Sequence, residues 1–263
     1  GFWLGHSEVV RSLATSCPQF FYKGMVPKTG LEPPNPAEIC QHYNNQYQFA
    51  TLYDTARRIP VYSAYIYEPG AAKRSQGWLI EPQLVNPKYS KSMETENNLL
   101  NREDINIQDI GSSQATTQDY VGLKGLTRGH MNPSGHHSNF TSKKATFTLT
   151  NIVPQNDKLN SGAWSRYEVS TMAKKSKGCT TTYVITGAVP GNTNIANGRV
   201  NTPSHIWSSA CCVTKSKLVA WAGIAENNKD KVQQISLGDL EKMLSNLYTR
   251  GRVSLFHSDC PRQ

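Results

Sequence analysis

Short runs of alternating apolar and polar residues predict a sheet in this chain. The runs are rich in β-branched and aromatic residues, and turn-forming residues separate them, with Arg57-Arg58 between the first two. A period of two places alternate side chains on opposite faces, which suits half-buried strands. The predicted strands cover residues 49–54, 59–67, 146–151, 183–189, 206–213 and 218–224, and residues 120–126 lead into a polar segment that begins at Thr127.

Helical spacing appears in three other segments. Residues 94–102 predict a short helix within the polar stretch 87–117, which we expect at the surface, and residues 159–175 predict a longer helix. Near the C-terminus, Ser236 can cap a helix together with Asp239 three residues later. The strands and helices together predict a mixed α+β fold. The apolar face of the last helix consists of Leu240, Met243, Leu244 and Leu247.

The N-terminal stretch, about residues 1–45, lacks a clear period. It contains Pro33-Pro34-Asn35-Pro36 and two cysteines, so it predicts a loop-rich arm that disulfides hold in place. A chain of 263 residues is long enough for one large domain or two small ones. Because the polar motifs are spread along the chain, we expect a single domain over residues 1–263.

Six cysteines show neither the CxxC nor the Cys/His spacing of a zinc site, so disulfides explain them better. We expect Cys17 to pair with Cys40, since the loop between them is short and rich in proline, while the other pairings stay open. Cys211 and Cys212 are adjacent in a predicted strand, so they point to opposite faces and should have different partners. The six are Cys17, Cys40, Cys179, Cys211, Cys212 and Cys260.

The sequence favours a secreted protein. Disulfides persist in oxidising compartments, and Asn139-Phe140-Thr141 is an N-glycosylation sequon, although sequons also arise by chance. No run of eighteen apolar residues occurs, so we expect no transmembrane segment. The sequence starts without a basic region followed by a long apolar stretch. We therefore expect a secreted chain whose signal peptide has been removed.

The chain is strongly basic. Lysine and arginine number 28 against 19 aspartates and glutamates, which gives a formal charge of +9 and a pI near 9.2. Such an excess suits a polyanionic partner such as DNA or RNA. A basic secreted protein of another kind would have the same composition, so the charge alone leaves both interpretations open.

Two polar segments supply the groups that phosphodiester hydrolysis needs. The first is Thr127-Arg128-Gly129-His130-Met131-Asn132-Pro133, and the second runs from Asn151 through Asn160 to Glu168. A phosphodiester attacked by water requires a base for the water proton, a hard cation at the phosphoryl oxygens, and a guanidinium for the developing charge. The two segments therefore predict a nuclease.

These segments resemble the motif blocks of the DNA/RNA non-specific endonuclease family, in the ββα-metal (His-Me finger) superfamily. The usual Asp-Arg-Gly-His block is similar to residues 127–130, and the Asn-x-x-Pro-Gln … Leu-Asn-x-Gly-x-Trp … Glu block is similar to residues 151–168. Flanking strands such as residues 49–54 resemble vertebrate endonuclease domain-containing proteins. The resemblance extends over about residues 17–260 and implies a central, mostly antiparallel sheet flanked by helices.

The resemblance also assigns roles to individual residues. His130 would activate the attacking water, a task that suits a neutral imidazole with a pKa near ~6.5. Asn160 would bind Mg²⁺ directly, or Mn²⁺ in its place, since an amide oxygen is a hard ligand. Glu168, about two turns along the same predicted helix, would hold metal-bound waters. Outside the motif these residues would be a structural histidine, a helix-capping asparagine and a solvated carboxylate.

Other motif residues would support the reaction. Arg128 would contact the scissile phosphate, because its planar guanidinium matches phosphate oxygens. Asn151 and Gln155 would brace the site by hydrogen bonds. Trp164 predicts core packing and no chemistry.

Three positions depart from the family pattern. Thr127 replaces the usual aspartate, and Glu168 is the candidate to take over its role. Two arginines of some relatives are also missing, since their places hold Ile66 and Met172. The replacement charge could come from Arg166, Lys174, Lys175 or Arg199.

Two further histidines, His136 and His137, lie close to His130 in the sequence. We expect them to be exposed loop residues, because no third ligand follows at a zinc spacing. A zinc-dependent hydrolase that uses all three histidines is the alternative.

The sequence as a whole predicts a secreted, Mg²⁺-dependent, sugar-non-specific endonuclease. It would cleave DNA and RNA with little sequence preference, since phosphate contacts do not read bases. The resemblance implies products with 5′-phosphate ends, and the oligomeric state stays open. The departures at Thr127, Ile66 and Met172 keep a second hypothesis, a catalytically weak nucleic-acid-binding protein on the same fold.

Overall fold

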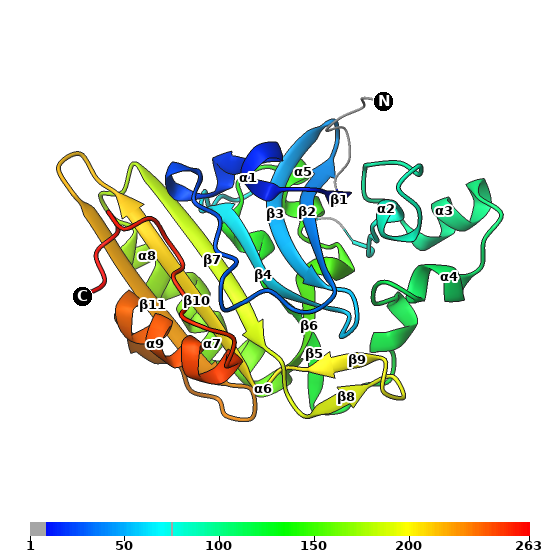
Figure 1. Ribbon diagram of the computed structural model, residues 1–263. Coiled ribbons are helices and arrows are strands. Elements are labelled where there is room, and N and C mark those ends of the chain that lie inside the picture. The colour runs from blue at the N-terminus through cyan, green and yellow to red at the C-terminus, as the bar shows by residue number, and fades with distance from the viewer. Residues whose placement is uncertain (1–8, 75) are drawn as a thin grey trace.

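Among the residues that the structure describes, 9–74 and 76–263, eight strands form a central sheet (Figure 1). All neighbouring strands in this computed structural model are antiparallel, which confirms the predicted α+β fold with a mostly antiparallel sheet. In spatial order the strands are β1 (Val9–Val10), β2 (Pro36–Tyr43), β3 (Gln46–Asp54), β4 (Ile59–Ile66), β7 (Thr181–Val189), β10 (His205–Val213), β11 (Leu218–Glu226) and β12 (Gln233–Ile235).

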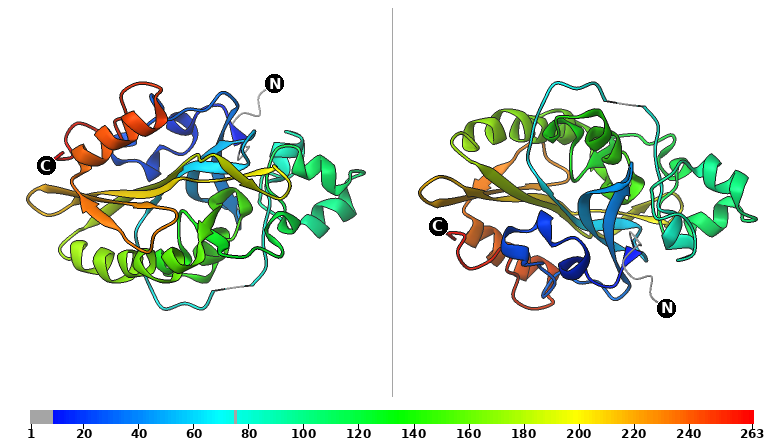
Figure 2. Two further views of the ribbon diagram at one scale, coloured as in Figure 1. Left: turned by 90° about the horizontal axis from the view of Figure 1, so that it is seen from below. Right: turned by 90° about the horizontal axis from the view of Figure 1, so that it is seen from above.

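Alternation along the strands gives this sheet two apolar faces. On β10, Trp207 and Cys211 belong to one buried cluster, whereas Ala210 and Cys212 belong to another. Helix α9 (Leu237–Tyr248) and the N-terminal segment cover the first face, and the helices between residues 140 and 175 cover the second. Figure 2 shows the sheet edge-on between these layers, with α9 on one side and the green helices on the other.

Three disulfides fasten these layers to the sheet. Cys17 pairs with Cys40, as the short loop predicts. Cys211 pairs with Cys260 on the side of α9, and Cys212 pairs with Cys179 on the other side. The prediction of different partners for the two adjacent cysteines is therefore confirmed.

The N-terminal arm is shorter than the sequence predicts. Residues 1–8 lie outside the described part of the chain, and the segment from residue 9 to residue 35 consists of the two-residue strand β1, loops and short helical turns. The expected boundary near residue 45 is wrong, because β2 begins at Pro36 and pairs with β3. The polar residues Gln41 and His42 are buried in this strand, so the sequence of β2 does not show the alternation of apolar and polar residues that predicts a strand.

The predicted helix over residues 159–175 is interrupted. Helix α6 (Asp157–Ser161) ends at Gly162, whose φ of −105° and ψ of −109° are not helical. A Cβ atom at Gly162 would lie 2.5 Å from Asp230 Oδ1, which instead accepts a hydrogen bond from the backbone nitrogen of Ala163. The chain then continues through α7 (Ala163–Arg166), a π-helical turn η6 (Tyr167–Thr171) and α8 (Met172–Lys175).

The predicted strand over residues 146–151 is wrong. Helix α5 (Phe140–Ala145) precedes this segment, and a 3-10 turn η5 (Leu149–Asn151) occupies its end. Its threonines satisfy their hydroxyl groups locally, since Thr146 Oγ1 donates to the carbonyl of Lys143 at 2.7 Å. The strand begins only afterwards, as β6 (Ile152–Asn156), and pairs with β5 (Leu126–His130) outside the central sheet.

Both of the other predicted helices are present. Helix α3 (Glu96–Arg102) carries an N-cap from Thr95, and Ser236 Oγ caps α9 by accepting from the backbone nitrogen of Asp239 at 3.0 Å. No helix in the described ranges combines the length and the apolarity that crossing a membrane requires. The remaining elements are α1 (Leu13–Ser16), η1 (Pro18–Phe20), η2 (Tyr22–Gly24), α2 (Pro82–Val85), α4 (Ile107–Gly111), η3 (Thr117–Tyr120), η4 (Ser134–His136), β8 (Thr193–Ile195) and β9 (Val200–Thr202).

Candidate active site

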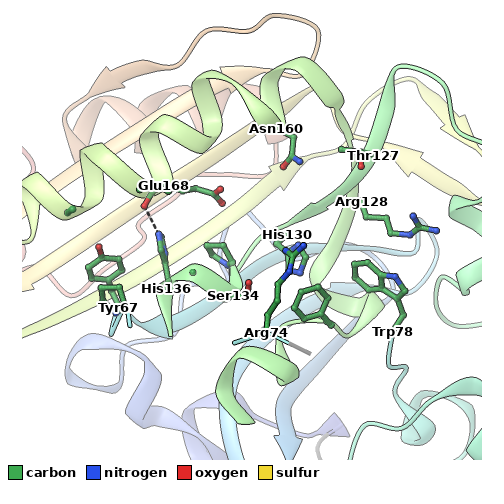
Figure 3. A pocket seen from close by; sticks show the side chains of 16 residues that line it. Tyr67, Arg74, Trp78, Thr127, Arg128, His130, Ser134, His136, Asn160 and Glu168 are labelled. Carbon is green, nitrogen blue, oxygen red and sulfur yellow. Dashed lines mark hydrogen bonds between the residues drawn. The ribbon is translucent and has the colours of Figure 1, made fainter. Parts of the chain in front are cut away.

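A cavity of about 580 Å³ opens beside the β5–β6 hairpin, and the predicted catalytic and metal-binding residues line it (Figure 3). Pockets of this size accommodate small ligands or one nucleotide unit. The predicted site residues in its wall are Thr127, Arg128, His130, Asn160 and Glu168. Other residues in the wall include Tyr67, Arg74, Trp78, His136 and Phe147.

The β5–β6 hairpin brings the two polar segments of the sequence side by side. Thr127 lies opposite Gln155, and His130 lies opposite Ile152. Position 129 of β5 requires a glycine, because a Cβ atom there would lie 2.3 Å from Oε1 of Gln155. The side chain of Gln155 crosses the space that any larger residue at Gly129 would fill.

The ring of His130 is held between aromatic side chains. Its centroid lies 4.7 Å from that of Phe147, in an edge-on arrangement, and 5.8 Å from that of Trp78. Nε2 of His130 is buried and has no hydrogen-bond partner among the described residues. Burial, assisted by the positive charge of Arg74, lowers the pKa of His130 to about 4. The imidazole is therefore neutral at neutral pH and can accept a proton.

Arg128 carries a positive charge without a carboxylate partner. Its guanidinium lies 5.5 Å from the ring centre of Trp78 and 5.9 Å from that of Tyr120. No acidic side chain in the described ranges forms an ion pair with it. The aromatic rings thus orient the guanidinium and leave its charge available to an anion.

Asn160 and Glu168 reach the same cavity from different helical segments. Asn160 lies in the last turn of α6, and Glu168 lies in the π-helical turn η6. The capping role that the sequence leaves open for Asn160 belongs instead to Asn156, whose side chain accepts from the backbone nitrogen of Leu159 at 3.0 Å. Burial raises the pKa of the Glu168 carboxyl to about 8, so at neutral pH the carboxyl is largely protonated unless a cation beside it stabilises the ionised form.

His136 and His137 are buried, so the prediction of exposed loop histidines is wrong. His136 uses both ring nitrogens, with Nδ1 2.9 Å from Tyr65 Oη and Nε2 2.8 Å from the carbonyl oxygen of Glu168. Nε2 of His137 lies 2.6 Å from Oδ1 of Asn132. These hydrogen bonds give both rings a structural role, and the hydrogen bond to the carbonyl oxygen of Glu168 helps to position the π-helical turn.

The two expected bracing residues differ in their contacts. The side chain of Asn151 accepts from Ser63 Oγ at 2.8 Å and from the backbone nitrogen of Asn132 at 3.0 Å. It also donates to the carbonyl oxygens of Asn132 and Thr146, each at 2.9 Å. Gln155 makes no side-chain hydrogen bond to the described residues and packs on Gly129. Trp164 is 1% exposed, which confirms the predicted core packing.

The positions that lack the family arginines are occupied by packed side chains. Met172 is buried, and its sulfur accepts a hydrogen bond from Trp221 Nε1 at 3.3 Å, while Ile66 packs against the core. Arg199 forms an ion pair with Asp119 at 2.8 Å, away from the cavity. Arg166, Lys174 and Lys175 are exposed and do not line the cavity.

Arg74, Trp78 and Phe147 are site residues that the sequence does not reveal. Arg74 and Trp78 belong to the segment after β4, outside both motif blocks, and Phe147 lies in the segment predicted as a strand. The one signal in the sequence is the basic pair Lys73-Arg74, four residues before Trp78. That signal is weak because basic residues are common on any surface.

Comparison with known proteins identifies relatives of this chain. Residues 26–256 match the model of the DNA/RNA non-specific endonuclease family. The Endonuclease domain-containing 1 protein of Mus musculus is 32% identical over 254 residues, which cover 93% of this chain and 47% of that protein. Nuclease EXOG, mitochondrial, of Xenopus laevis is 40% identical over 119 residues, which cover 45% of this chain and 31% of that protein. The chain thus spans less than half the length of these relatives.

A solved structure shares the fold. A chain in the crystal structure of the EndoG/EndoGI complex superposes with a TM-score of 0.54 at 18% identity, over 81% of this chain and 87% of that one. The expected ββα-metal nuclease fold is confirmed by this match. Together, the family match over most of the chain and the motif residues around one cavity show that this chain belongs to the DNA/RNA non-specific endonuclease family, a family of nucleases.

Proposed function

We propose that this protein is a secreted, Mg²⁺-dependent endonuclease that hydrolyses phosphodiester bonds of DNA and RNA. One observation carries the proposal: a histidine with a free ring nitrogen and an arginine without a carboxylate partner share a cavity with an amide and a carboxylate. These residues are His130, Arg128, Asn160 and Glu168. The family and the net charge of +9 support the same conclusion.

In this reaction the protein side chains move a proton and stabilise charge. Nε2 of His130 accepts the proton of the attacking water, which its lowered pKa permits because the ring is neutral. Arg128 donates from its guanidinium to the phosphate oxygens as negative charge accumulates on them. The aromatic contacts of Arg128 hold the guanidinium in place before the substrate arrives.

The donor set in the cavity fits a hydrated divalent cation. Asn160 would bind the cation directly through its amide oxygen, and Glu168 would accept hydrogen bonds from the bound waters. Within the described ranges, no three His, Cys, Asp or Glu side chains gather to hold a metal, so the cation would keep most of its water shell. When bound, it would supply positive charge at the phosphoryl oxygens and the leaving group.

The proposal is tested by incubating the protein with supercoiled plasmid DNA and with RNA at low salt. We expect cleavage of both in Mg²⁺, no cleavage in EDTA, and recovery after Mg²⁺ is added back. Recovery with Zn²⁺ but not Mg²⁺ would contradict the assignment of the cation. Intact nucleic acid in Mg²⁺, together with a shift of DNA in a gel, would instead support the weak binding protein that Thr127, Ile66 and Met172 leave open.

We also propose that the chain is secreted and glycosylated at Asn139, and that residues 1–263 form one domain around the central sheet. Three disulfides suit an oxidising compartment. Asn139 is exposed, and its Oδ1 accepts a hydrogen bond from the backbone nitrogen of Ser142 at 2.8 Å. Protein from mammalian culture medium should lose mass on treatment with an N-glycosidase, and Asn139→Gln should remove that difference. An untreated mass equal to that of the bare chain would contradict the modification.

A further inference from the structure

We propose that Arg74 is a catalytic residue that binds the scissile phosphate and supplies the positive charge missing at Ile66 and Met172. The inference rests on the proposed nuclease function. Arg74 belongs to neither motif block and precedes both of them in the sequence. It would be the second guanidinium of the active site, beside Arg128.

The position of Arg74 in the cavity supports this role. Its guanidinium lies 5.6 Å from the ring centre of Phe147, and the same ring lies 4.7 Å from that of His130. Figure 3 shows the Arg74 side chain extending to the neighbourhood of His130, on the side away from Asn160 and Glu168. Arg74 forms no ion pair with the described residues, so its charge is not already neutralised.

The loop that carries Arg74 is anchored on both sides of it. Before Arg74, the backbone nitrogen of Glu68 donates to the carbonyl oxygen of His136 at 2.9 Å. After it, Nζ of Lys144 donates to the carbonyl oxygen of Gln76 at 2.6 Å. The anchoring groups belong to the segment that forms one wall of the cavity, so they fix the loop across the site. Figure 2 shows this cyan loop on the same side of the sheet as the green helices.

Two guanidiniums near one base suit the charge that phosphodiester hydrolysis creates. The phosphoryl group gains negative charge as water attacks, and planar guanidiniums bind its oxygens in pairs. Arg74 and Arg128 each lie on an aromatic ring without an acidic partner, so both hold their charge near His130 before substrate binds. Glu168 lines another wall of the cavity, where the cation would bind.

The test compares Arg74→Gln with Lys73→Gln, a neighbouring control with the same change of charge. Lys73 is exposed and does not line the cavity. With a short DNA duplex in Mg²⁺, we expect Arg74→Gln to lower kcat by about 10²- to 10³-fold, as loss of one transition-state donor does. Lys73→Gln should change kcat/KM less than about threefold, in line with the loss of one peripheral phosphate contact. Arg74→Lys should restore part of the kcat, because an ammonium keeps the charge but not the fork.

Each alternative result overturns the inference. Equal losses in the two glutamine variants would mean that the loop contributes only general attraction for nucleic acid. A normal kcat in Arg74→Gln, with loss in His130→Ala, would remove Arg74 from the mechanism and leave the proposed nuclease function intact. Wild-type protein that leaves DNA and RNA whole would overturn both proposals.

Discussion

Replacement of His130 by alanine is expected to lower kcat/KM for Mg²⁺-dependent DNA cleavage by about 10²- to 10⁴-fold, the contribution typical of a general base. The reason is that Nε2 of His130 is the free basic nitrogen in the cavity, whereas both ring nitrogens of His136 are hydrogen-bonded. Initial rates on a short fluorescent duplex measure the loss. The matched control is His257→Ala, a half-buried histidine outside the cavity, and it should retain the wild-type rate.

The pH profile provides an independent check on His130. Because burial lowers its pKa to about 4, the ring stays neutral as the pH falls through 6.5 and takes up a proton only near pH 4. At saturating Mg²⁺, kcat should therefore not show a limb centred near pH 6.5. Saturation matters because protonation of Glu168, whose pKa is raised to about 8, opposes cation binding as the pH falls. A limb at pH 6.5 that disappears in His130→Ala would contradict a buried, neutral base.

Replacement of Asn160 by alanine is expected to lower activity by about 10²- to 10⁴-fold, since a metal ion contributes several kcal/mol to charge stabilisation. Asn160 is the proposed direct ligand, and Glu168 alone would hold the cation only through water. The loss should be accompanied by a weaker apparent affinity for Mg²⁺, measured as the Mg²⁺ concentration at half-maximal rate. Asn160→Asp should retain Mg²⁺ dependence, because a carboxylate is also a hard ligand.

The control for this prediction is Asn228→Ala, the same substitution at an exposed turn outside the cavity. It should leave both the rate and the Mg²⁺ dependence unchanged. If Asn160→Ala cleaved DNA with the wild-type Mg²⁺ profile, the cation would have to bind elsewhere. The proposed donor set would then be wrong, even though the nuclease activity remained.

Strands with a clear period could be predicted from the sequence because their side chains alternate between two faces. Residues 183–189, 206–213 and 218–224 all lie inside strands of the sheet. A strand was wrongly predicted over residues 146–151, because β-branched threonines suit strands and also suit buried turns in which their hydroxyls form local hydrogen bonds. The end of the N-terminal arm was predicted too late in the sequence, because the buried polar residues Gln41 and His42 hide the alternating pattern of strand β2.

The motif residues of the cavity could also be predicted, because their order, spacing and chemistry resemble the motif blocks of the family. The rest of the cavity depends on tertiary contacts that local sequence does not encode. His136 and His137 follow Pro-Ser-Gly, a polar context, yet Tyr65 from β4 covers both rings. The loop that carries Arg74 into the cavity is anchored by hydrogen bonds to residues that are distant in the sequence.

The disulfide between Cys211 and Cys260 determines what proteolysis would do to this protein. The turn after β11 contains Lys229 and Lys231, both exposed, where a trypsin-like enzyme could cut. Such a cut would separate residues 1–229 or 1–231 from the segment that carries α9. The Cys211–Cys260 disulfide would still join the two pieces, and α9 would keep its contacts with the sheet. A nicked molecule would thus stay joined until it met a reductant, at which point α9 would no longer be covalently linked to the sheet that it helps to cover.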